Sequence, residues 1–383
     1  MLIKLARVPV WASTIVLPLV NFLLAALAAG AVVLIIYWQP FSTGTLPFAD
    51  YLMTPLRAAG ILFTGAFGDG RNLSYTLFYA TDFIFAGLAV AVAAHGGLFN
   101  IGVEGQAYVS GLGVTLVCLH LAFLPALILF PVAIIAALAF GAAWAFLPGY
   151  LQARRGSHVV ITTIMFNFIA ASLMVYVLVH VLAAPGRMTP ESPHFAPKAS
   201  LLTLTDVMRW FGRSFSKVPL NISFVLALAC SWAVWIFIWR TRWGYALRTV
   251  GFSARAATYA GIRVDRVVIA ILCLSGALGG LIAVNEVMGS QQRLVLNFVA
   301  GAGFVGIAVS LMGRNHPFGI VLASLLFGAL YQGGSQLSFA MPAITRDLTV
   351  VIQGVIILFA GALEHMFRAP IEALFKTGGG GSE

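Results

Sequence analysis

Long apolar blocks without a charged side chain constrain this chain more than any other feature. Residues 14–38 carry no charge over 25 consecutive positions, and residues 123–147 form a second block of the same kind. Neither block has the polar stripe that a helix on the surface of a soluble protein needs. Because about 18 consecutive apolar residues suffice to cross a bilayer core, each block predicts a transmembrane helix.

Similar blocks recur along nearly the whole chain, in which 61% of residues are hydrophobic and only 9% are charged. Soluble domains carry about 25% charged residues. We therefore predict an all-α, polytopic membrane protein with about ten transmembrane helices, for which pseudo-symmetric halves are one option. The expected spans are Thr14–Trp38, Leu77–Ala94, Glu104–Leu121, Phe123–Leu147, Val159–Leu182, Ile222–Trp239, Val267–Val284, Phe298–Met312, Phe318–Gly334 and Leu348–Leu363.

Positive charge predicts the orientation, because Lys and Arg gather in cytoplasmic loops. Lys4 and Arg7 precede the first span and place the N-terminus in the cytoplasm. Counting alternate loops puts residues 240–266, with six arginines and one acid, on the same side. This parity holds if residues 51–67 form an outside or re-entrant helix rather than a full span. The net charge of +10 is then an orientation signal, and no nucleic-acid partner is expected.

Three regions follow from these patterns. Residues 1–75 comprise an N-terminal helix and the outside or re-entrant segment, and residues 76–370 form the main transmembrane domain. That domain contains a proline-rich outside loop at 185–220, expected either as a folded cap or as a flexible linker, and the cytoplasmic loop at 240–266. The tail at 371–383 ends in GGGGSE, which is typical of an appended flexible linker. The first apolar block is too long for a signal-peptide core and is read as a retained helix.

The stretch His95–Gln106 interrupts the apolar pattern with four glycines and with Asn100, Glu104 and Gln106. Non-helical backbone at membrane depth persists only where protein buries it or water reaches it, and transporters use such discontinuous helices to hold polar substrates. We therefore predict a discontinuous helix near 95–106 whose polar residues line the substrate pathway or its gate. The alternative is a tight cytoplasmic turn, with Glu104 as the acid of a first helical turn.

Polar side chains inside other spans extend this prediction. Asn167 lies midway through an apolar block, and Asn285 and Glu286 end another. Each of them alone is equally compatible with a structural hydrogen bond between helices, worth about 0.6 kcal/mol on average. Together with the residues of 95–106 they are numerous enough to line a polar path.

The cytoplasmic loop predicts a docking element. Residues 243–262 alternate small apolar residues with arginines, and Ser253 is suited to cap a second short helix. Two short amphipathic helices joined by a hinge fit a groove on a soluble partner, whereas the alternative is a helix lying on anionic lipid. The residues expected to form this coupling element are Tyr245, Leu247, Arg248, Gly251 and Tyr259.

At residues 97–106 the run GLFNIGVEGQ resembles the signature of permeases in bacterial nucleoside and simple-sugar ABC importers, relatives of the ribose and branched-chain amino-acid permeases. Residues 149–170, 243–262 and 301–318 are similar to later parts of the same family, in the expected order. The resemblance implies a permease subunit of the bacterial inner membrane that forms the translocation path for nucleosides, or for related purines or pentoses.

The resemblance also implies partners. Such permeases pair with a second permease chain, identical or different, and work with cytoplasmic ATP-binding subunits and an extracytoplasmic substrate-binding lipoprotein. This chain has no GxxxxGK[ST] sequence, so ATP and Mg²⁺ are expected on the partner ATPase, and no catalytic residue, metal ligand or cofactor is expected here. Gly301–Gly306 satisfies GxGxxG but lies within apolar sequence, which favours close helix packing.

Two other classes of protein, a secondary transporter and a membrane-embedded enzyme, need residues of which the sequence supplies few. An ion- or proton-coupled secondary transporter needs buried carboxylates or histidines in a relay, and only Glu104 and Glu286 qualify by sequence. A membrane-embedded enzyme needs paired acids, a His/Asp set or metal ligands in one plane, and the histidines near the span ends form no such set.

Overall fold

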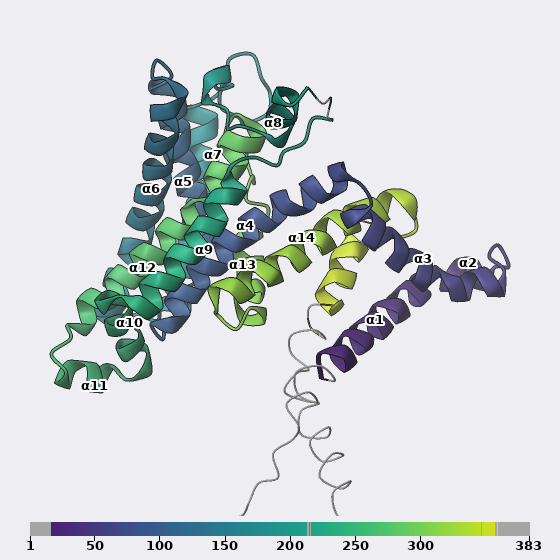
Figure 1. Cartoon of the computed structure of the whole chain (residues 1–383), viewed down its shortest axis with the longest axis horizontal. Coiled ribbons are helices and arrows are strands. Elements are labelled where there is room, and N and C mark those ends of the chain that lie inside the picture. The colour runs from purple at the N-terminus through teal and green to yellow at the C-terminus, as the bar shows by residue number, and fades with distance from the viewer. Residues whose placement is uncertain (1–16, 213, 215, 346, 357, 359–383) are drawn as a thin grey trace, which may run out of the picture. The chain divides into compact units, whose positions relative to one another are not determined.

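The computed structural model describes residues 17–358 apart from 213, 215, 346 and 357 (Figure 1). The described part consists of helices and connecting segments, with two isolated bridges as its only β pairing. Six helices are long and apolar enough to cross a membrane, and shorter apolar helices accompany them. The prediction of an all-α, polytopic membrane protein is therefore confirmed.

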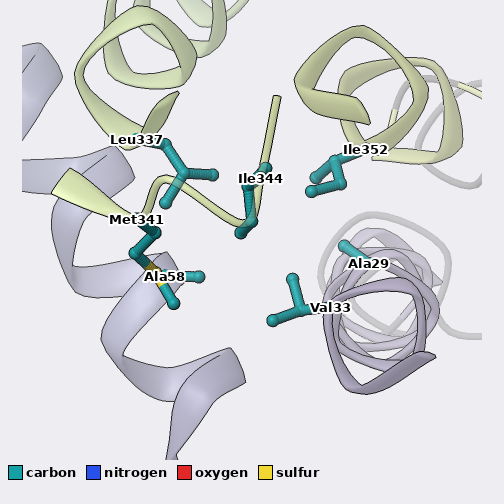
Figure 2. Close-up of a cluster of buried hydrophobic side chains, with 7 residues drawn as sticks. All are labelled: Ala29, Val33, Ala58, Leu337, Met341, Ile344 and Ile352. Atoms are coloured by element: carbon teal, nitrogen blue, oxygen red, sulfur yellow. The ribbon is translucent and has the colours of Figure 1, made fainter. Parts of the chain in front are cut away.

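The chain divides into two compact units. In the first, the described residues up to Gly68 pack with those from Leu330 onward. Its elements are α1 (Leu17–Ile36), α2 (Trp38–Ser42), α3 (Phe48–Phe67), the end of α14 (Pro317–Ala340) and an apolar helix at Asp347–Ile356. Figure 2 shows a cluster of buried hydrophobic side chains in this unit: Ala29, Val33, Ala58, Leu337, Met341, Ile344 and Ile352.

The segment expected as an outside or re-entrant helix is the 20-residue helix α3. It packs closely on the end of α14, because Gly65 lies under the side chain of Gln336 and a Cβ at Gly333 would meet the Leu62 backbone. The Tyr51 hydroxyl donates a hydrogen bond to the Leu34 carbonyl of α1 over 3.1 Å. That α3 lies outside the membrane or re-enters it, rather than crossing it fully, stays a prediction.

The second unit, Asp69–Ala329, has two interior helices surrounded by others. In α4, and in the span Val264–Gln291 that joins α12 to the π-helix, 83% and 78% of the most apolar window is buried, against 22–28% in α6, α7 and α9. The outer helices therefore leave most of their apolar side chains exposed on the surface of this unit. The bounds are α4 (Gly70–His95), α5 (Val103–His120), α6 (Ala126–Arg155), α7 (Val159–His180), α9 (Ser223–Arg240) and α12 (Val264–Gly280), followed by a π-helix at Val284–Gln291 and by α13 (Ala302–Met312).

Two helices of this unit begin after irregular backbone. Residues 96–102 separate α4 from α5, and residues 292–301 separate the π-helix from α13. Gly97 and Gly301 have φ angles of 71° and 84°, a region that glycine adopts without steric cost. The expected span Phe298–Met312 is consequently shorter, since the 11 residues of α13 rise only about 16 Å at 1.5 Å per residue.

The proline-rich loop is folded. It contains a 3₁₀ turn at Pro197–Ala199 and the helix α8 (Leu204–Trp210), and it pairs with the segment after the π-helix through Glu191 and Val295. Glu191 also accepts hydrogen bonds from Arg187 and Arg293 at 2.7 and 3.0 Å. Figure 1 shows α8 and α11 at opposite ends of the second unit, and the side of the membrane on which each loop lies stays a prediction.

The loop at 240–266 forms α10 (Arg242–Phe252) and α11 (Ala254–Tyr259). Ser253 caps α11 as predicted, because its hydroxyl accepts the Ala256 N–H. The hinge between the helices is therefore Ser253, whereas Gly251 lies inside α10.

Glycine contacts between α6 and α12 lead to a stability prediction. A Cβ at Gly276 would overlap the Gly141 carbonyl oxygen and lie 3.0 Å from the Gly141 carbonyl carbon. We expect Gly276→Ala to lower the thermal midpoint of the detergent-solubilised chain, with a cost of about 1–3 kcal/mol for overpacking. Gly60→Ala is the control, since a Cβ at Gly60 meets nothing within 4 Å. Equal midpoints for the two variants would contradict this packing.

The cap of α8 leads to a pH prediction. Thr203 and Asp206 form a capping box, and the hydrogen bond from the Thr203 hydroxyl holds the pKa of Asp206 below its ordinary value. Because the folded pKa is lowered, the stabilisation is present above the unfolded pKa of about 3.9 and is lost as pH falls through the folded value. We expect amide protection at 204–210 to fall in acid, and Asp206→Asn to remove this pH dependence in hydrogen exchange.

Candidate functional site

The N-termini of α5 and α13 meet at Glu104. Its two carboxylate oxygens accept the N–H groups of Gly301 and Gly303, each over 2.9 Å. These are among the donors that a helix N-terminus leaves without intrahelical partners, and a carboxylate there also complements the helix dipole. Glu104 is 5% exposed, so water does not replace it. One side chain of α5 therefore closes the start of α13.

The first turn of α5 is held in a matching way by amide side chains. Asn167 of α7 accepts the Gly105 N–H and donates to the Ile101 carbonyl, both over 2.9 Å. Asn100 accepts the Gly102 N–H over 2.8 Å. The irregular backbone before α5 thereby finds partners inside the protein, as backbone at membrane depth must.

Asn100 and Gln106 form an amide pair that reaches two further helices. Asn100 donates to Gln106 and to the Ser275 hydroxyl of α12 over 3.1 and 2.8 Å. Ser275 in turn donates to the Ala89 carbonyl of α4 over 2.6 Å. All four residues are buried. A buried polar network of this kind is stabilising when it is fully paired and costly when one member is removed.

The structure therefore brings Asn100, Glu104, Gln106 and Asn167 together in one polar layer that we call the half-helix junction, and their role in the substrate pathway stays a prediction. In this conformation each of the four side chains is bonded to protein groups. These hydrogen bonds hold the N-terminus of α5 against the N-terminus of α13, and we call this arrangement a closed junction.

A second polar cluster surrounds the π-helix. Asn285 donates to the Asp82 carboxyl over 3.0 Å and accepts from Asn221 over 2.9 Å. Glu286 lies beside Asp82, so the cluster brings two acidic side chains together. We call these four residues the π-helix cluster, and π-helical turns are frequent at functional sites.

Sequence reasoning missed Asp82. Its signal was present, because Asp82 is a lone acid within the expected span Leu77–Ala94 and an ionisable residue inside a span is a functional candidate. The structure places it 3% exposed against Asn285 and Glu286. Asn285 and Glu286 were predicted, but they lie in this cluster rather than at the half-helix junction. Within the described residues, no three His, Cys, Asp or Glu side chains form a metal-binding group.

The expected coupling residues divide between two faces of the loop helices. Tyr245 and Tyr259 are 60% and 95% exposed, whereas Leu247 is 2% exposed and packs inward. The Arg248 guanidinium donates to the Gly244 carbonyl over 3.4 Å. Gly251 lies against the backbone of residues 95–97. Phe252, which the sequence analysis did not select, is 94% exposed. The loop helices therefore present exposed aromatic rings at Tyr245, Phe252 and Tyr259, and also at Trp243.

Residues 72–361 match the family described as the permease component of the branched-chain amino acid transport system. The match covers well over half of the chain, which therefore belongs to this family of ABC transporter permeases. The resemblance seen at residues 97–106 is thus confirmed, and the chain is the permease subunit of an ABC importer.

Individual relatives are similar over most of their length. The guanosine ABC transporter permease protein NupP of Bacillus subtilis is 34% identical over 96% of this chain and 98% of that protein. The glucose ABC transporter permease protein TsgB13 of Haloferax volcanii is 32% identical over 93% and 90%. The nucleoside ABC transporter permease protein NupB of Lactococcus lactis is 31% identical over 83% and 87%.

The half-helix junction leads to a prediction for Glu104. Glu104→Ala leaves the buried N–H of Gly303 and the part-buried N–H of Gly301 without their acceptor. A buried unpaired N–H costs about 1–3 kcal/mol, so we expect a clear fall in the thermal midpoint and in folded yield. Glu104→Gln keeps one acceptor oxygen and should fall between that variant and the wild type. If Glu104→Ala melts like the wild type, the carboxylate does not hold α13.

Proposed function

We propose that this permease forms the translocation path for nucleosides, or for related purines or pentoses, and is driven by separate ATP-binding subunits docked on α10 and α11. The observation that carries the proposal is the half-helix junction, where Glu104 of α5 closes the start of α13. The substrate class rests on the relatives named for guanosine and nucleosides. The glucose relative keeps a sugar as the alternative substrate.

The transport step in this proposal is the opening of the junction. Moving α5 away from α13 breaks two hydrogen bonds to a charged group, worth about 1.5–3 kcal/mol each. It also frees Asn100, Gln106 and Asn167 to bond to a polar solute. Alternating access by rocking of helices around a midplane site requires contacts that form in one state and break in the other.

The π-helix cluster is the second part of the proposed path. Asn285, Glu286 and Asp82 supply amide and carboxyl groups of the kind that bind hydroxyl groups of a ribose. A π-helix carries an extra residue in its turn and is easily rearranged. We infer that this cluster and the half-helix junction contact the solute in succession.

The proposed partners follow the paired relatives. Nucleoside permeases NupB and NupC both come from Lactococcus lactis, and guanosine permeases NupP and NupQ both come from Bacillus subtilis. We infer a second, different permease chain, with a homodimer as the alternative. ATP and Mg²⁺ belong to the cytoplasmic subunits, and an extracytoplasmic substrate-binding lipoprotein docks over the loop at 185–220. The basic loop at 240–266 supports a cytoplasmic N-terminus in a bacterial inner membrane.

One observation favours the second candidate, an ion- or proton-coupled transporter. Asp82, a buried acid that the sequence analysis did not select, lies beside Glu286, and neighbouring acids inside a membrane occur in proton relays. The family membership weighs against it, so proton dependence is a test outcome rather than the proposal.

The deciding experiment is uptake into vesicles that contain the full complex with both permease chains and the ATP-binding subunits. We expect uptake of labelled guanosine to require ATP, to resist a protonophore, and to be inhibited more strongly by other nucleosides than by glucose. Asp82→Asn should reduce uptake about tenfold or more, equivalent to about 1.4 kcal/mol. Gly60→Ala is the control, because Gly60 lies outside both polar clusters and outside α10 and α11, and a Cβ there meets nothing within 4 Å.

Three outcomes would contradict the proposal. If glucose alone inhibits the uptake of labelled guanosine, the substrate is a sugar. If the protonophore abolishes uptake and no ATP is hydrolysed, the protein is a proton-coupled transporter. Full uptake by Asp82→Asn would remove the π-helix cluster from the path.

A further inference from the structure

The backbone of α10 touches the backbone at the end of α4 without a side chain between them. A Cβ added at Gly251 would overlap the carbonyl oxygen of His95 and lie 2.9 Å from the Gly96 carbonyl carbon and the Gly97 nitrogen. In the reverse direction, a Cβ at Gly97 would lie 3.1 Å from the Gly251 Cα and carbonyl oxygen. Residues 95–97 and Gly251, more than 150 residues apart in sequence, are therefore in direct backbone-to-backbone contact.

This contact lies at the start of the irregular segment 96–102. Gly96, Gly97 and Leu98 return their N–H groups to carbonyls of the last turn of α4, at Ala93 and Ala94. The segment then runs to Asn100 and Gly102, where the half-helix junction begins. Seven residues thus connect the contact with α10 to the first turn of α5, which carries Glu104.

The α10 helix has the two faces that a force-transmitting element needs. Gly244, Leu247 and Gly251 are spaced as one helical face and face the protein. A Cβ at Gly244 would overlap the carbonyl oxygens of Phe237 and Ile238 at the end of α9. The opposite face presents Tyr245 and, at the hinge, Phe252. A load applied to the exposed face is therefore passed to α9 and α4 through backbone contacts.

Aromatic rings join the same helix ends. The His95 ring lies 5.2 Å from the Trp239 ring of α9, and Trp239 lies 5.1 Å from His316 in the turn before α14. The C-terminal ends of α4 and α9 and this turn are thereby held beside Gly251. A side-chain contact can absorb a small displacement by changing rotamer, but a backbone contact between glycines cannot, since packed interiors respond by moving whole elements.

We propose that Gly251 is the positioning residue that couples the docking helices α10 and α11 to the half-helix junction, by pressing directly on the backbone of residues 95–97. The inference rests on the proposed function for the ATP-binding subunits, and it goes beyond it by naming the contact that carries the movement into the membrane. Movement of α10 shifts residues 96–102, which shifts the first turn of α5 and the Glu104 contacts with α13.

The test is Gly251→Ala in the full reconstituted complex, with Gly60→Ala as the matched control at a helical glycine that has open space around it. We expect the complex of Gly251→Ala to assemble and to hydrolyse ATP within about twofold of the wild type, while solute moved per ATP falls about tenfold or more, a coupling change of about 1.4 kcal/mol. A wild-type ratio of transport to hydrolysis overturns the inference, and so does a parallel loss of both activities in an assembled complex.

A second measurement does not depend on the variant or on the solute. Hydrogen exchange of the wild-type complex is compared in nucleotide-free and ATP-trapped states. We expect the exchange of residues 96–102 to change together with that of residues 245–259. If the ATP-binding subunits protect 245–259 and 96–102 stays unchanged, the inference fails while the proposed function stands. If no ATP-binding subunit associates with the chain, both fail.

Discussion

A helix that starts inside a membrane leaves donors which water cannot satisfy, and in this protein Glu104 supplies the missing acceptors. Its two oxygens bind the N–H groups of Gly301 and Gly303, while Asn167 and Asn100 serve the start of α5. Without these partners neither half-helix could start here, because an unpaired backbone group in hydrocarbon costs several kcal/mol. The irregular segments 96–102 and 292–301 are therefore tolerated because the half-helix junction supplies hydrogen-bond partners to the helix starts that follow them.

Bare backbone contacts make the surrounding bundle stiff. Gly141 meets Gly276 between α6 and α12, Gly303 meets the backbone of Glu104, and Gly251 meets residues 95–97. Helices in a membrane gain little from hydrophobic exclusion, so close approach through small residues provides much of their packing energy. At these glycine contacts no side chain lies between the backbones, so no rotamer change can absorb a displacement of one helix. A bundle packed in this way changes state by shifting entire helices, which is what alternating access requires.

Local signals predicted several elements correctly, and long-range contacts explain what they missed. The apolar blocks located the helices, Ser253 was correctly expected to cap α11, and the glycines of 95–106 marked the break before α5. The shortening of α13 was not foreseen, because its apolar sequence continues upstream through Ala300 and Gly301, which adopt positive φ angles. Asp82 was passed over because its partners, Asn285 and Glu286, lie about two hundred residues away.

The amino-acid sequence by itself determined that the chain is a helical membrane protein, because hydrophobic length acts locally and needs no partner. It also marked several polar residues inside the spans, since an uncompensated polar group in an apolar span is costly, although it passed over Asp82. Only the tertiary structure decided how they pair. Glu104 with α13, Asp82 with Glu286, and Gly251 with His95 are contacts between distant segments, and periodicity along one helix carries no information about which helix lies beside it.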